Sequence, residues 1–189
     1  MGIFRNYWDM FLLREEGYKR ATQIGFGTAI LIHVLLFLSY LIGVIFLQLL
    51  LQTFGVSTEN WFIFLLEILF TGIFWIPWYL FFVFAFWLGA KTLGGKGSYK
   101  GHFVGASNIM IYGLLLVIPV LGWVLSFFIG LWAIIMGVKL AQHHHKLEVG
   151  SAIGSGLLGT LYLFLAFFII WLLFFVLVLS LLMGASFGA

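Results

Sequence analysis

The feature that most constrains this sequence is a series of long apolar stretches separated by short polar segments. A helix that crosses a bilayer needs about 20 mainly apolar residues. Five stretches reach or approach that length, at residues 24–51, 61–90, 103–118, 120–140 and 152–183. The third is the shortest, and residues 119–122 after it are expected to form a tight turn. The sequence therefore predicts an all-α integral membrane protein built as a five-span bundle of transmembrane helices.

The composition excludes several other classes of protein. Hydrophobic residues make up 64% of the chain and charged residues 8%, whereas globular chains carry about 25% charged residues. Such a chain cannot cover a water-facing surface. A net charge of +3 spread over loops provides no basic groove, so no nucleic-acid partner is expected. Because there is no cysteine, disulfides, thiolate metal sites and cysteine nucleophiles are excluded.

The basic residues predict the orientation in the membrane. All nine Lys and Arg precede the first stretch, separate the second from the third, or flank the loop between the fourth and fifth. The positive-inside rule assigns such segments to the cytoplasm. We therefore predict a multi-pass protein of the cell (inner, cytoplasmic) membrane, with a cytoplasmic N-terminus and the C-terminus outside.

Residues 1–21 are predicted to form an amphipathic helix in the cytoplasmic interface, ahead of a membrane domain at residues 22–189. Their apolar residues recur at helical spacing, namely Phe4, Tyr7, Trp8, Phe11 and Leu12. A simple anchor beside the membrane explains this pattern, and a docking surface for a partner protein is the alternative.

Small residues at four-residue spacing predict where helices approach closely in the membrane. They lie in the fourth stretch and at the start of the fifth, namely Gly122, Ser126, Gly130, Gly137, Ser151, Ser155 and Gly159. We expect them to form packing faces between the third, fourth and fifth spans. Self-association through an exposed face is the alternative.

The second stretch, residues 61–90, is rich in aromatic residues on all sides and contains Pro77 near its middle. Proline removes a helical hydrogen bond and predicts a kink. An aromatic wall beside a kink can hold a quinone, a pigment or a lipid. Bulky side chains that simply face lipid explain the same pattern, so no cofactor is predicted.

Polar side chains inside the predicted spans are candidates for function. Glu67 is expected to make a structural polar contact, by reaching outward to the interface, by bonding Thr71 one turn on or by meeting Gln48 near the outer end. A proton or cation site is the alternative. His33 is expected near the inner end, opposite Ser107 and Asn108. A structural hydrogen bond and a ligand role are both open for His33.

His143, His144 and His145 are expected in a solvated cytoplasmic loop. Side chains of neighbouring residues on a helix point in different directions, so these three are only weak candidates for a metal site, and no metal is predicted.

We also find no arrangement of residues typical of catalysis. The segment around Lys96 fails as a phosphate-binding loop because Gly97 follows the lysine where a Ser or Thr is needed. The sequence therefore predicts a protein that is not an enzyme.

One combination of motifs is similar to a known family. A turn with Gly94, Gly95, Lys96, Gly97 and Ser98 is followed by a short span, by the sequence IPVLGW and by GVK at the end of the next span. Over about residues 88–179 this order resembles the Yip (Ypt/Rab-interacting protein) domain family, in its short prokaryotic form. The resemblance implies five spans and a cytosolic N-terminus. The N-terminal tail lacks the motif of the eukaryotic members, so GTPase binding is not transferred.

Three functional hypotheses follow from the sequence. The first is a non-enzymatic scaffold, accessory subunit or membrane-organising factor, whose partners are the lipid bilayer and other membrane proteins or a second copy. The second is a small transporter or channel that uses Glu67 and His33. The third is an accessory subunit that binds a quinone or pigment on residues 61–90.

Overall fold

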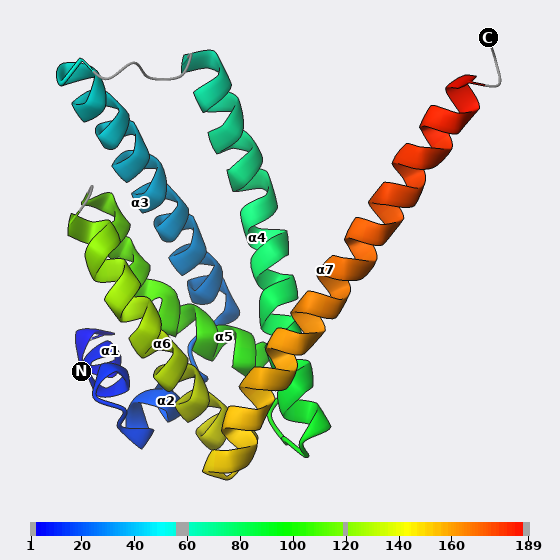
Figure 1. Cartoon of the computed structure of the whole chain (residues 1–189). Helices are drawn as coiled ribbons and strands as arrows, with labels where there is room; N and C mark the ends of the chain where they lie inside the picture. The colour runs from blue at the N-terminus through cyan, green and yellow to red at the C-terminus, as the bar shows by residue number, and fades with distance from the viewer. Residues whose placement is uncertain (1–2, 56–60, 119–120, 187–189) are drawn as a thin grey trace.

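The computed structural model describes residues 3–55, 61–118 and 121–186 (Figure 1). All regular elements in these residues are helices: α1 (Ile3–Phe11), α2 (Glu15–Ala21), α3 (Phe26–Thr53), α4 (Trp61–Thr92), α5 (Tyr99–Ile109), the 3-10 helix η1 (Met110–Val117), α6 (Leu121–His145) and α7 (Val149–Ser186). Three segments are long and apolar enough to cross a membrane, namely Phe26–Thr53, Leu66–Thr92 and Val149–Ser180. The expectation of an all-α membrane protein is confirmed at this level.

The third apolar stretch is a composite of α5 and η1. Ser98 begins α5 because its Oγ accepts a hydrogen bond from the amide of Gly101 at 3.2 Å. The α-helix has 11 residues and the 3-10 helix has 8. With rises of about 1.5 and about 2.0 Å per residue, the two together extend about 33 Å. The 3-10 winding therefore stretches a short segment to about the thickness of a bilayer core.

The N-terminal residues form two helices, so the prediction of one amphipathic helix over residues 1–21 is wrong. The chain reverses between α1 and α2, where Leu13 has a φ of 58°. The two helices touch at Gly17, where an added Cβ would lie 2.6 Å from the amide nitrogen of Met10. The buried carboxylate of Asp9 fixes the reversal through Arg14 at 3.0 Å and Arg20 at 3.5 Å.

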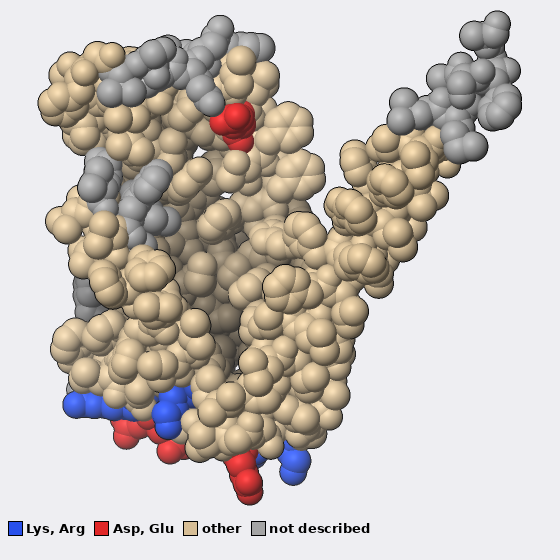
Figure 2. All heavy atoms as spheres, in the orientation of Figure 1, with Lys and Arg blue, Asp and Glu red and all other residues tan. Residues whose placement is uncertain are grey.

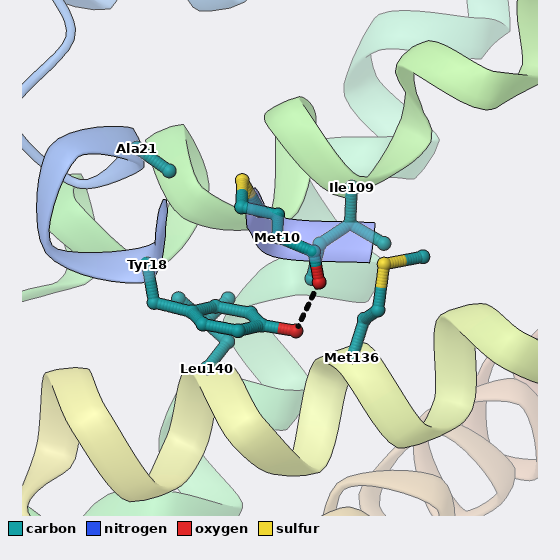
Figure 3. Close-up of a cluster of buried hydrophobic side chains, with 6 residues drawn as sticks. All are labelled: Met10, Tyr18, Ala21, Ile109, Met136 and Leu140. Carbon is teal, nitrogen blue, oxygen red and sulfur yellow. Dashed lines mark hydrogen bonds between the residues drawn. The ribbon is translucent and has the colours of Figure 1, made fainter. Parts of the chain in front are cut away.

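A hydrophobic cluster fixes α1 and α2 against α5 and α6. Figure 3 shows its buried members, Met10, Tyr18, Ala21, Ile109, Met136 and Leu140. The Tyr18 hydroxyl donates to the carbonyl of Met10 at 3.1 Å, and the Trp132 indole donates to the carbonyl of Phe11 at 2.9 Å. The N-terminal helices are thus part of the core, although Trp8 stays 59% exposed.

A second cluster joins α3, α4 and α5, and contains Ala29, Tyr79, Val83, Phe103 and Val104. Helix α4 runs through Pro77 as one helix. Both clusters lie toward the end of the molecule where α1 and α2 sit (Figure 1). Lys and Arg side chains gather at that same end in Figure 2.

Helix α7 has 38 residues, about 57 Å at the rise of an α-helix. Its first part packs against α4 and its C-terminal half leaves the other helices (Figure 1). From Phe167 to Leu177 every side chain is exposed. In Figure 2 a notch separates this half of α7 from the rest of the molecule.

Candidate functional site

An apolar groove opens between α4, α5, α6 and α7, with a volume of about 350 Å³. Its wall on α4 consists of Tyr79, Phe82, Val83 and Phe86, which belong to the aromatic stretch that the sequence singled out. A second groove of about 580 Å³ between α4 and α7 shares Phe82 and Phe86 with the first. The two grooves therefore adjoin each other at these two side chains of α4.

The small residues of α6 line this groove instead of packing against another helix. An added Cβ on Gly130 or Gly137 would meet nothing within 4 Å, and both residues line the groove. This differs from the expected packing face between the fourth and fifth spans. The physical reason is that α7 leans on α4 at this depth, which leaves a gap beside α6.

The close helix contact is made by α4 and α7. A Cβ on Gly159 would lie 2.8 Å from the Cα of Phe86, and one on Gly89 would meet the carbonyl oxygen of Ser155.

The other small residues that were expected to pack between helices lie elsewhere. Gly122 leaves no room for a Cβ because it packs on the carbonyl of Leu115 in the turn between η1 and α6. Ser151 is half-buried at the start of α7. The side chain of Ser126 lies outside the described residues.

One polar side chain of the groove lining belongs to a pair of buried histidines. His102 of α5 lines the groove and is 6% exposed, and His145 ends α6 and is fully buried. Their rings meet through Nε2 of His145 and Nδ1 of His102, 3.0 Å apart. The contact needs one ring nitrogen that donates and one that accepts.

The glycine-rich segment after α4 packs around these histidines. The Lys96 amide donates to the carbonyl of His145 at 3.0 Å, and the Trp87 indole donates to the carbonyl of Gly97 at 3.2 Å. Gly94 takes a φ of 85° at the end of α4. Gly95 approaches His145 so closely that an added Cβ would lie 2.9 Å from its Nδ1. Only glycine fits at such a distance.

Nε2 of His144 lies 2.9 Å from the carbonyl oxygen of Ser98, the residue that caps α5. The structure thus brings together the glycine-rich turn and the histidines that the sequence analysis treated separately. It also corrects the placement of the three histidines, because they form the last residues of α6 instead of a solvated loop. His143 stacks on Tyr18, with ring centroids 5.5 Å apart.

His102 was missed by the sequence analysis. The sequence marks His102 only weakly as a site residue. It lies just before the third apolar stretch and belongs neither to a predicted span nor to the predicted histidine loop. A usable signal is that four of the five histidines, His102 among them, lie next to the predicted cytoplasmic segments.

His33 lies beside Ser107, as the sequence analysis placed it. Nε2 of His33 is 3.1 Å from the Ser107 Oγ, and that hydroxyl donates to the carbonyl of Phe103 at 2.8 Å. The serine oxygen therefore accepts from His33. Asn108 is used differently, because its Nδ2 donates to the carbonyls of Val104 at 2.7 Å and Ala21 at 3.4 Å. These bonds give both residues a structural role.

Glu67 and Gln48 do not make a polar contact with each other. Glu67 is exposed on α4, and Thr71 donates to its backbone carbonyl at 2.8 Å. Gln48 is buried, and its Nε2 has no partner among the described residues. The described residues contain no group of three His, Asp or Glu able to hold a metal ion.

No protein-family model matches the chain, and neither the curated proteins nor the solved structures contain a match. The resemblance to the Yip domain family stays a prediction.

Proposed function

We propose that the chain crosses the inner membrane five times, through α3, α4, the α5–η1 segment, α6 and α7. The combined length of α5 and η1, about 33 Å by helix rise, supports the short third span. The gathering of Lys and Arg at one end supports a cytoplasmic position for that end (Figure 2). In this orientation the N-terminal helices and the histidine pair lie on the cytoplasmic side.

The function that the geometry supports best is the binding of an apolar, lipid-like molecule without catalysis. The observation that carries this proposal is the groove of about 350 Å³ beside α4, lined almost entirely by apolar side chains. Glycines of α6 leave it unfilled, and apolar pockets with a few polar groups are the usual form of small-molecule sites. A protein of this kind acts as an accessory subunit or membrane-organising factor.

A groove-filling substitution tests the proposal. Gly137→Leu places a side chain in the groove where nothing opposes its Cβ. Gly27→Leu is the matched control, because Gly27 also faces open space but lies on α3, away from the groove. Each protein is purified in mild detergent and its bound molecules are identified by native mass spectrometry and by absorbance.

We expect a bound apolar molecule in the wild type and in Gly27→Leu, and its loss in Gly137→Leu. Equal occupancy in all three proteins contradicts a site in this groove, and so does a wild type that carries nothing after purification in its native lipids.

A scaffold role is a second candidate, and the exposed half of α7 favours it. From Phe167 to Leu177 exposed side chains cover all sides of α7, so this part offers a long apolar surface to another membrane protein. The chain has no cysteine, so a single Phe174→Cys variant places one crosslinker on this surface. A stoichiometric crosslinked partner in native membranes supports the scaffold role, and crosslinks to lipid alone oppose it.

A further inference from the structure

The ring nitrogens of the histidine pair differ in what they contact. The contact of 3.0 Å uses Nε2 of His145 and Nδ1 of His102. Of the two nitrogens in this contact one donates and the other accepts, so one hydrogen lies between the two rings. Two arrangements are possible, according to which ring donates.

The surroundings of His145 select one arrangement. Its Nδ1 is buried and has no hydrogen-bond partner among the described residues. A buried donor without a partner is rarer than a buried acceptor without one. We therefore assign Nδ1 of His145 as the ring nitrogen without a hydrogen. The hydrogen of His145 is then on Nε2, which donates to His102. His102 then accepts at Nδ1 and carries its own hydrogen on Nε2.

This assignment gives the groove a hydrogen-bond donor at its cytoplasmic end. His102 lines the groove, is 6% exposed and uses Nδ1 for His145, so its Nε2–H is left for a ligand. Ser155, another buried polar side chain of the lining, donates to the carbonyl of Ala152 at 2.7 Å. The lining also contains Tyr79, whose buried hydroxyl has no hydrogen-bond partner among the described residues. A neutral N–H donor suits a neutral oxygen acceptor such as a carbonyl.

The rest of the site constrains the shape of the occupant. Aromatic side chains of α4 stand beside the donor, with Tyr79, Phe82 and Phe86 in the same lining as His102. Planar rings pack well against such side chains. The second groove continues from Phe82 and Phe86 along α7 toward Phe167 and Trp171, and it can hold a long apolar tail.

We propose that the groove binds an isoprenoid quinone, with one carbonyl oxygen on Nε2 of His102 and the prenyl tail in the second groove. This inference rests on the proposed function, because it names the class of ligand for the same groove. Binding of the quinone in this way requires no electron transfer. An acyl lipid, the other apolar molecule that the groove can hold, is an outcome of the test.

The test titrates ubiquinone-2 into the purified wild type and into His102→Phe, which keeps a ring and removes the donor. Bound quinone is measured by quenching of tryptophan fluorescence, and the carbonyl stretch of carbonyl-¹³C-labelled quinone by infrared spectroscopy. His143→Phe is the matched control, because His143 lies on α6, the helix of His145, and stacks on Tyr18 outside the groove.

We expect binding by the wild type and by His143→Phe, with the carbonyl stretch shifted to lower wavenumber relative to detergent alone. His102→Phe should weaken binding about tenfold, the effect of one hydrogen bond, and should abolish the shift. The infrared shift in the wild type stands even where the variant folds poorly. A wild type that binds quinone without the shift overturns the role of His102.

Two further outcomes separate this inference from the proposed function. If the wild type retains an acyl lipid that Gly137→Leu loses, and ubiquinone-2 does not bind, the groove is a lipid site and the quinone proposal is wrong. If neither molecule binds, both proposals are wrong.

Discussion

Gly89 of α4 and Gly159 of α7 lie in backbone contact, since a Cβ on Gly89 would stand 2.8 Å from the amide nitrogen of Gly159. This contact is the point where α7 leans on α4. Close approach of backbones through small residues is a common way to join helices in a membrane. Because α7 is held against α4 here, it does not fill the space beside α6, and the groove is the result.

Gly159→Leu should destabilise the protein. Its Cβ would lie 2.8 Å from the Cα of Phe86, so a helix backbone has to move. Overpacking of this kind costs about 1–3 kcal/mol. Thermal unfolding in detergent measures the effect as a lower Tm. Gly150→Leu on the same helix is the control, because an added Cβ there meets nothing within 4 Å. Equal Tm values for both variants contradict the contact.

Asp9→Asn should loosen the reversal between α1 and α2. Asp9 is 4% exposed and pairs with Arg14 and Arg20. The Arg14 side chain is 62% exposed, so solvent screening limits the effect to about 1 kcal/mol. Trypsin should cleave after Arg14 roughly fivefold faster, in line with that energy.

Glu148→Gln is the control for this variant. Glu148 is exposed just before α7, outside α1 and α2, and its loss should leave the cleavage rate unchanged. A rate that is the same in Asp9→Asn and in the wild type means that the hydrophobic cluster around Tyr18 holds the N-terminal helices without help from Asp9.

The five-span arrangement predicts opposite labelling at two exposed positions. The chain has no cysteine, so Leu121→Cys and Lys100→Cys each carry one thiol. A membrane-impermeant maleimide should label Leu121→Cys in intact cells, because the proposed arrangement places the turn between η1 and α6 outside. It should label Lys100→Cys only after permeabilisation. Labelling of both positions from the same side would refute the passage of α5 and η1 through the membrane.

The sequence predicted the long helices well because apolar length is a local property. The second stretch was expected at residues 61–90, and α4 runs from Trp61 to Thr92. The proximity of His33 and Ser107 also followed from depth along two neighbouring spans. Such inferences need only helix rise and chain order.

What the sequence did not reveal depends on which helices meet. The small residues of α6 and α7 suggested one shared interface, yet Gly159 packs on Phe86 while Gly137 faces the groove. The reversal at Leu13 was also missed, because the apolar spacing of residues 1–21 fits one helix and the Asp9 contacts are tertiary. The pairing of His102 with His145 joins two helices that spacing along the chain cannot relate.

The most direct test of the groove is photo-crosslinking with a lipid analogue that carries a diazirine in its apolar chain. The protein is labelled in vesicles, digested and mapped by peptide mass spectrometry. We predict crosslinks concentrated at groove residues such as Phe82, Phe86 and Met110, and their loss in Gly137→Leu. Crosslinks confined to the exposed half of α7, with none at the groove in the wild type, would contradict the account.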